Sequence, residues 1–241
     1  MRAIILAAGR GSRMQGLTSD KPKCLVELRG KPLLHRQMDS LKASGIDEIG
    51  IVTGYQREQL AAYGLHEFVN EAWQTTNMVA SLVRASEWLE QDACIVSYSD
   101  IFYEPEAPDL LQKSDADIAV TYDPDWLEIW SKRFEDPLDD AETFRLDGDR
   151  IVEIGRKPDT VSEVEGQYMG LLRFSPAGWA EVRRIFDGLP ADRAAKLDMT
   201  SLLQAIIDAG RVPVTGIAYR GEWGEVDSGE DLAAYTNDPD A

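Results

Sequence analysis

The N-terminal stretch of this chain, residues 3–34, restricts its possible folds more than any other part. Residues 3–8 form a short apolar run, which is typical of a buried parallel strand. The run ends at Gly9, and Gly9 and Gly11 allow the backbone to turn sharply. Successive amide groups can then face one centre, and such a nest after a strand suits phosphate oxygens. The stretch therefore predicts an α/β fold with a phosphate site where the first strand ends.

The same stretch is a basic island in an acidic protein. Seven of the first 31 residues are Lys or Arg and two are acidic, whereas the whole chain has 25 basic and 43 acidic residues and a net charge of −18. Arg10, Arg13, Lys21 and Lys23 follow the glycines closely. A net charge this negative argues against nucleic acid or an anionic membrane as a partner. A small phosphorylated ligand held by local cations fits better.

Two familiar phosphate-binding motifs do not match. A dinucleotide fingerprint would need glycine at position 14, where this chain has Met14, and the G-K-[ST] end of a Walker A loop is missing. The glycines alone leave open an ordinary strand-to-helix turn with solvated cations.

The rest of the sequence predicts one cytoplasmic domain, residues 1–241. Its 44% hydrophobic content is enough for a large core. No apolar run reaches the length of a membrane span, and the first predicted strand begins at once, with no signal-peptide pattern. Cys24 and Cys94 lie in apolar runs, which predicts that both are core residues. Strands alternate with helices, which predicts a mainly parallel, doubly wound sheet. Strands are expected at residues 48–53, 66–69, 93–99, 118–122, 167–174 and 212–219, and helices at 32–44, 56–62, 78–89, 176–186, 199–209 and 230–235.

Two segments interrupt this alternation. Residues 143–154 predict a hairpin that turns at Asp147-Gly148. Residues 123–142 are rich in aromatic and acidic side chains and have prolines near both ends, which suggests an inserted lid over a substrate site. Residues 223–229 read as a loop.

The pattern L-x-x-G-x-G-x-R-M, followed by P-K-C-L, is more specific than the glycines. It resembles the nucleotidyltransferases that activate sugar phosphates and phosphocholine, which share one Rossmann-like α/β fold. The resemblance implies that Arg13 and Lys23 hold a triphosphate and that Lys157, in a later K-P motif, contacts the acceptor phosphate. It also implies Mg²⁺ on Asp100 and Asp227, in agreement with the usual preference of Mg²⁺ for one or two carboxylates plus substrate phosphates. The implied nucleotide site comprises Leu6, Ala8, Gly9, Gly11, Arg13, Lys23, Asn77, Ser81 and Asp100.

Two departures from the sugar-activating members favour the phosphocholine-type, CTP-dependent branch. Arg156 stands where those relatives have a glutamate before the lysine, and Thr76-Asn77-Met78 replaces their G-T-A-type loop. Each aspartate taken alone could be a turn residue, and Lys157 could be a solvated turn lysine.

The predicted lid supplies a hypothesis for the acceptor. Trp126 and Trp130, with Tyr168 and Trp223, could form an aromatic cage for an ammonium group beside the lid carboxylates. Because Trp126 and Trp130 are four residues apart, they could equally pack together on one helix face.

These features predict transfer of CMP from CTP to a small phosphorylated amine or alcohol, such as phosphocholine, 2-aminoethylphosphonate or a phosphorylated amide or amino acid. The acceptor oxygen would attack the α-phosphorus, and pyrophosphate would leave. The acceptor phosphate is largely dianionic at neutral pH, so neither His35 nor His66 is needed as a base. A hexose-1-phosphate nucleotidyltransferase, a molybdenum-cofactor nucleotidyltransferase, a non-catalytic nucleotide-binding regulator and a Rossmann redox protein remain alternatives. The acceptor and the oligomeric state stay open.

Overall fold

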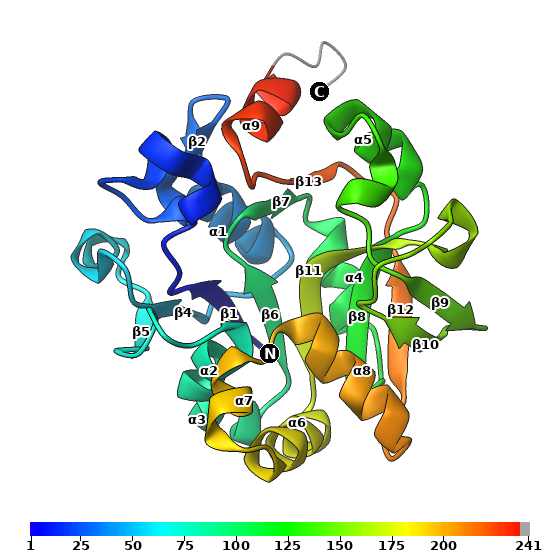
Figure 1. The fold of residues 1–241 in the computed structure, drawn as a ribbon. Helices are drawn as coiled ribbons and strands as arrows, with labels where there is room; N and C mark the ends of the chain where they lie inside the picture. The colour runs from blue at the N-terminus through cyan, green and yellow to red at the C-terminus, as the bar shows by residue number, and fades with distance from the viewer. Residues whose placement is uncertain (237–241) are drawn as a thin grey trace.

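A nine-stranded mixed sheet forms the centre of the computed structural model, which describes residues 1–236 (Figure 1). The strand order is β5-β4-β1-β6-β11-β8-β12-β10-β9. The strands are β1 (Arg2–Ala7), β4 (Ile49–Thr53), β5 (His66–Val69), β6 (Cys94–Tyr98), β8 (Ile118–Asp123), β9 (Phe144–Asp147), β10 (Arg150–Ile154), β11 (Gln167–Phe174) and β12 (Val214–Ala218).

The sheet is parallel in its N-terminal half and mixed beyond it. β5, β4, β1 and β6 are parallel neighbours, with Ile5 of β1 opposite Ile51 and Ser97. β11 is antiparallel to both β6 and β8, whereas β8 and β12 are parallel. The hairpin of β9 and β10 extends the edge and turns at Gly148, whose φ is +66°. The predicted doubly wound, largely parallel sheet is therefore confirmed, with β11 and the hairpin as its antiparallel part.

Helices cover both faces because β1 is apolar from Ala3 to Ala7 and alternate side chains point to opposite faces. Ile4 packs in one core cluster and Ile5 in the other. The Ile5 side is covered by α1 (Leu33–Ala43), α4 (Glu106–Gln112) and α5 (Trp126–Arg133). The Ile4 side is covered by α2 (Met78–Leu82), α3 (Ser86–Gln91), α6 (Pro176–Gly188) and α8 (Met199–Ala209), with α7 (Ala191–Lys196) beside α2.

Two short strands that the sequence did not predict decide where the site lies. β7 (Ile101–Tyr103) pairs antiparallel with β13 (Trp223–Glu225), so residues 223–225 are a strand and not part of a loop (Figure 1). A second short pair, β2 (Glu27–Leu28) and β3 (Lys31–Pro32), lies near α9 (Gly229–Thr236). These elements share a small third core cluster around Leu28, Phe102 and Val226.

Most predicted helices agree with the structure, and two do not. Residues 56–62 form two 3₁₀ turns, Arg57–Gln59 and Ala61–Tyr63, in place of one helix. The helix expected over residues 78–89 is divided into α2 and α3 by the 3₁₀ turn Val83–Ala85. Its predicted cap is confirmed, because the Asn77 side chain accepts a hydrogen bond from the Met78 amide.

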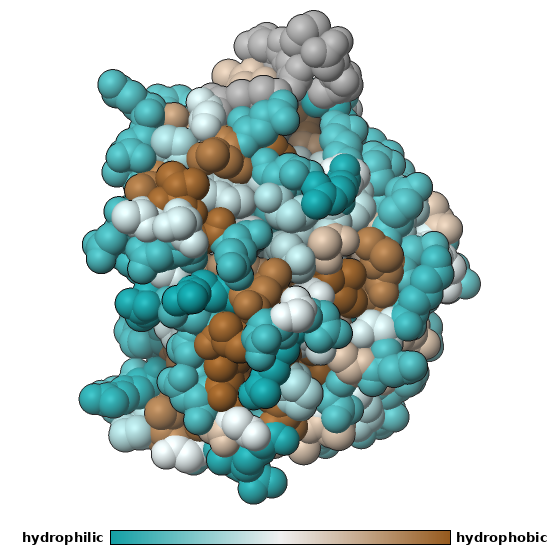
Figure 2. All heavy atoms as spheres, turned by 90° about the vertical axis from the view of Figure 1, so that its right-hand side faces the viewer, coloured by the Kyte–Doolittle hydropathy of each residue, from teal (hydrophilic) through white to brown (hydrophobic). Residues whose placement is uncertain are grey.

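The surface over the edge strands is mostly hydrophilic. Figure 2 shows this face, where apolar patches are separated by polar side chains. Such scattered apolar exposure is ordinary for a protein surface. Within residues 1–236, no helix is both long enough and apolar enough to span a bilayer.

Candidate active site

The phosphate loop after β1 is shaped around one buried lysine. Gly11 has φ of +68°, and a Cβ placed on it would lie 2.8 Å from Cδ of Lys23. The lysine stem therefore crosses the loop where only glycine leaves room, and Lys23 is 7% exposed. The loop and the lysine form one unit at the carboxyl end of β1.

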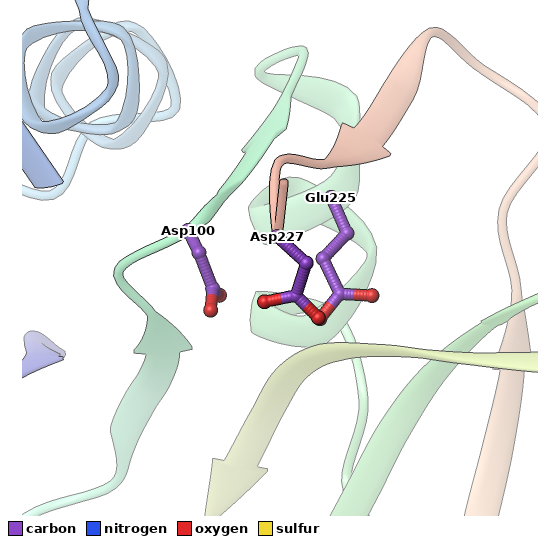
Figure 3. A group of neighbouring side chains, drawn as sticks. All are labelled: Asp100, Glu225 and Asp227. Atoms are coloured by element: carbon purple, nitrogen blue, oxygen red, sulfur yellow. The ribbon is translucent and has the colours of Figure 1, made fainter. Parts of the chain in front are cut away.

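Three carboxylates from two distant segments meet beside this lysine. Asp100 precedes β7 and Asp227 follows β13, and the pairing of these strands places Val226 N 2.9 Å from Asp100 O. Glu225 is the third carboxylate, and one oxygen from each residue lies within 4.8 Å of the others. Figure 3 shows Glu225 and Asp227 side by side, with Asp100 facing them.

The sequence interpretation missed Glu225. The signal was present in E-V-D, because residues i and i+2 of an extended segment share one face. Because residues 223–229 were predicted to be a loop, this two-residue periodicity of a strand was not applied to them.

Cations neutralise part of this cluster. Lys23 Nζ lies 2.7 Å from Asp100 Oδ2 and also donates to Asp227, and Arg13 lies 2.8 Å from Asp227. Burial by itself would lower the pKa of Lys23, but Asp100 and Asp227 more than compensate and raise it. Burial would raise the pKa of Asp227, yet Lys23 and Arg13 hold it below its usual value. Burial and the two aspartates raise the pKa of Glu225 well above its ordinary range.

A cavity of about 310 Å³ opens above the phosphate loop. All nine residues of the predicted nucleotide site line it, so the structure brings together what the sequence could only place on separate elements. Trp73 and Thr76, which the sequence interpretation did not include, also line this cavity. Trp73 packs edge-on against Tyr55, whose hydroxyl donates to Ser19 O and so ties this wall to the phosphate loop segment.

A second cavity, of about 340 Å³, adjoins the first. Arg13 and Asp227 line both cavities, so the two spaces meet at these side chains. The remaining lining residues are Tyr98, Asp140, Glu142, Gln167, Tyr168, Met169, Gly170, Asp198, Met199, Thr200 and Glu225. Tyr168, a predicted acceptor residue, therefore lines the cavity that adjoins the predicted nucleotide site.

The second cavity is strongly acidic. In the described part of the chain, no lysine or arginine is within ion-pair distance of Asp140, Glu142 or Asp198. Burial raises the pKa of Asp140 and of Glu142, and neighbouring carboxylates add to the shift of each, whereas Arg133 and Arg13 partly offset the shift of Asp140. The Thr200 hydroxyl donates to Glu142 at 3.4 Å, and this hydrogen bond partly offsets the rise in the pKa of Glu142. A cation bound here would relieve the repulsion among these carboxylates.

The predicted aromatic cage is wrong. Trp126 is 3% exposed and Trp130 0% exposed, and both belong to the core under α5. Trp126 Nε1 donates to Val164 O at 3.0 Å, and Trp130 packs on the ring of Trp223. Trp223 is also buried, and its Nε1 donates to Asp123 at 3.0 Å. The apolar face of α5 turns toward the sheet, so these rings line neither cavity.

Lys157 is also absent from both cavity walls. Its side chain is exposed, and Nζ donates to the carbonyl oxygens of Leu138 and Asp139. The lysine therefore fixes the backbone just before Asp140 in this structure. The predicted contact with an acceptor phosphate stays a prediction.

Within the predicted lid, Arg133 of α5 connects to the carboxylate cluster. This side chain is 1% exposed, and its Nε donates to Asp231 at 2.8 Å. Its Nη1 lies 3.9 Å from Glu225, and its guanidinium sits 4.7 Å over the Trp130 ring. Asp231 in turn accepts from the backbone amides of Asp227 and Ser228. α5 thus braces the carboxylate cluster from behind.

A phosphate loop with two cations, a carboxylate cluster at the strand ends and two adjoining cavities define a nucleotidyltransferase site. Residues 3–153 match the MobA-like NTP transferase domain, and the chain belongs to this family.

Individual relatives agree with this membership. A CTP:phosphoglutamine cytidylyltransferase from Campylobacter jejuni is 36% identical, over 96% of this chain and 98% of the relative. A choline-phosphate cytidylyltransferase from Streptococcus pneumoniae is 37% identical over a shorter stretch, 42% of this chain and 46% of the relative. The solved structure of the inositol-1-phosphate CTP transferase from T. maritima superposes with a TM-score of 0.75 at 20% identity, covering 98% of this chain and 96% of that one, and shows the same fold.

Proposed function

We propose that this protein transfers CMP from CTP to a small phosphorylated acceptor that carries a cationic amino group, and releases pyrophosphate. The observation that carries the proposal is the junction of two cavities at Arg13 and Asp227. One cavity offers amides and cations for a triphosphate, and the other offers carboxylates for a cation. Both sequence relatives named above are cytidylyltransferases, which supports CTP as the donor.

The donor set of the carboxylate cluster fits Mg²⁺. Hard oxygen ligands are what this ion prefers, and Asp100, Glu225 and Asp227 bring three carboxylates within reach of one another. Mg²⁺ bound there would neutralise charge on the nucleotide phosphates. We therefore include a magnesium requirement in the proposal.

The chain's own residues would act by positioning and charge neutralisation. An oxygen of the acceptor phosphate forms a bond to the α-phosphorus of CTP, and the bond from that phosphorus to the bridging oxygen breaks. The electron pair leaves with pyrophosphate, whose charge the loop amides, Arg13 and Lys23 would stabilise. The second pKa of a phosphomonoester is about 6, so the attacking oxygen needs no general base.

Incubation of the protein with CTP, Mg²⁺ and a panel of acceptors tests this proposal. The panel contains phosphoethanolamine, phosphocholine, 2-aminoethylphosphonate, phosphorylated amino acids and hexose 1-phosphates, and the readouts are pyrophosphate release and the mass of the CMP adduct. Asp100→Asn should nearly abolish turnover and leave the fold intact. Asp115→Asn is the matched control, because Asp115 is exposed just before β8, at the opposite end of the sheet.

Three outcomes would contradict the proposal. Equal pyrophosphate release by wild type and Asp100→Asn would remove the carboxylate cluster from the reaction. Preference for UTP or GTP with a hexose 1-phosphate would make the protein a sugar-activating enzyme. Binding of CTP with no turnover of any acceptor would indicate a nucleotide-binding regulator.

A further inference from the structure

The acidic cavity also carries information about the kind of amine. We infer that the acceptor presents a primary ammonium group, and not a quaternary one, to the carboxylates of Asp140, Glu142 and Asp198; this rests on the proposed function. A primary ammonium has three N–H donors, whereas a trimethylammonium group has none. The two groups therefore need walls of different chemistry.

The cavity does not have the wall that a quaternary ammonium needs. Such cations are held by several aromatic ring faces. Among the described residues that line this cavity, only Tyr98 and Tyr168 are aromatic. Their rings meet edge to face, with centroids 5.6 Å apart and an interplanar angle of 87°, so one ring uses a face to pack on the other. Gly170 covers Tyr98 further, since a Cβ there would lie 2.8 Å from its ring. The tryptophans that could have completed a cage are in the core.

The cavity does have carboxylates that are not ion-paired, and an amide oxygen that has no hydrogen-bond donor. Asp140, Glu142 and Asp198 come from two segments, and among the described residues no lysine or arginine lies within ion-pair distance of them. Gln167 gives an independent indication. It is 9% exposed, lines the same cavity, and its Oε1 has no hydrogen-bond partner. A buried amide oxygen left unpaired is costly, and an N–H donor from a ligand would satisfy it.

The arrangement is held in place by the chain around it. Thr200 donates toward Glu142 at 3.4 Å, and Asp198 caps α8 by accepting from Ser201 N at 2.7 Å. Gly155 follows the last residue of β10 and has φ of +90°, which lets the backbone there pack against Thr200. The acceptors are thus positioned before any ligand binds, which favours discrimination by hydrogen bonding.

The test compares acceptors that differ only in N-methylation. Phosphoethanolamine and its mono-, di- and trimethyl forms make one series, and 2-aminoethylphosphonate with its trimethyl form makes a second pair. With CTP and Mg²⁺ at saturation, kcat/KM should fall at each methylation, by about 100-fold or more from the primary to the quaternary acceptor. Equal or higher kcat/KM for the quaternary members would overturn the inference.

Variants assign the effect to this cavity. Glu142→Gln should lower kcat/KM for the primary amines by about tenfold or more, mainly through the acceptor KM, and leave the KM for CTP unchanged. Asp139→Asn is the matched control, since Asp139 is exposed and lines neither cavity. An unchanged selectivity in Glu142→Gln would also overturn the inference.

The failure of the inference and the failure of the proposed function give different results. If 2-hydroxyethyl phosphate, which has no charge at that end, matches phosphoethanolamine, the protein is a cytidylyltransferase and the ammonium assignment is wrong. If no acceptor of either series supports pyrophosphate release from CTP, the proposed function itself fails.

Discussion

Replacement of Arg133 by methionine is the perturbation whose size follows most directly from the structure. The methionine keeps most of the side-chain volume and removes the charge. Asp231, whose side chain is 7% exposed, then loses the donor at 2.8 Å and remains a buried carboxylate. Breaking a buried pair in this way costs about 3–5 kcal/mol, because the remaining charge is uncompensated. We expect Arg133→Met to lose about 3 kcal/mol of unfolding free energy and about 6–12 °C of Tm.

Urea unfolding at neutral pH measures the loss, and two variants make the assay specific. Arg183→Met removes an exposed pair with Asp187 and should change the unfolding free energy by less than about 0.5 kcal/mol. Asp231→Asn added to Arg133→Met should recover part of the loss, because the amide removes the stranded charge and its oxygen can still accept from the backbone amides of Asp227 and Ser228. A loss below about 1 kcal/mol in Arg133→Met, or no recovery in the double variant, would refute the reasoning.

Three further predictions concern the loop, the core and the pH dependence of stability. Gly11→Ala should raise the KM for CTP because the new Cβ would displace Lys23; an unchanged KM would show that the lysine stem is not confined by the loop. Trp130→Ala should cost about 3–5 kcal/mol of unfolding free energy without a selective rise in the acceptor KM, and a selective rise would restore the cage hypothesis. Hydrogen bonding to Arg57 lowers the pKa of the Glu67 carboxyl from 4.5. The stabilisation of the fold by ionised Glu67 is therefore complete above that value and is lost as the pH falls through the lowered pKa. The Tm of Glu67→Gln should therefore lie below that of wild type at neutral pH and converge with it in acid, and a constant difference would contradict the assignment.

The sequence by itself determined the features whose physics is local. An apolar run followed by Gly9 and Gly11 requires a strand and a sharp turn, and the structure has both. The cap of α2 at Asn77 and the hairpin turn at Gly148 were predictable for the same reason, because a side-chain cap or a positive φ depends on a few neighbouring residues.

The family resemblance implied that Asp100 and Asp227 share a site, but only the tertiary structure showed how they meet, added Glu225 to them and decided which face of α5 is buried. Asp100 and Asp227 come together because β7 pairs with β13, a contact between short strands far apart in the sequence. The i, i+4 spacing of Trp126 and Trp130 places them on one helix face but cannot say whether that face turns to the core or to a ligand. The acidic cavity is assembled from separate segments that contribute Asp140 and Glu142, Asp198, and Glu225 with Asp227. Sequence periodicity reports the surroundings of one element at a time, whereas a site of this kind depends on how distant elements pack together.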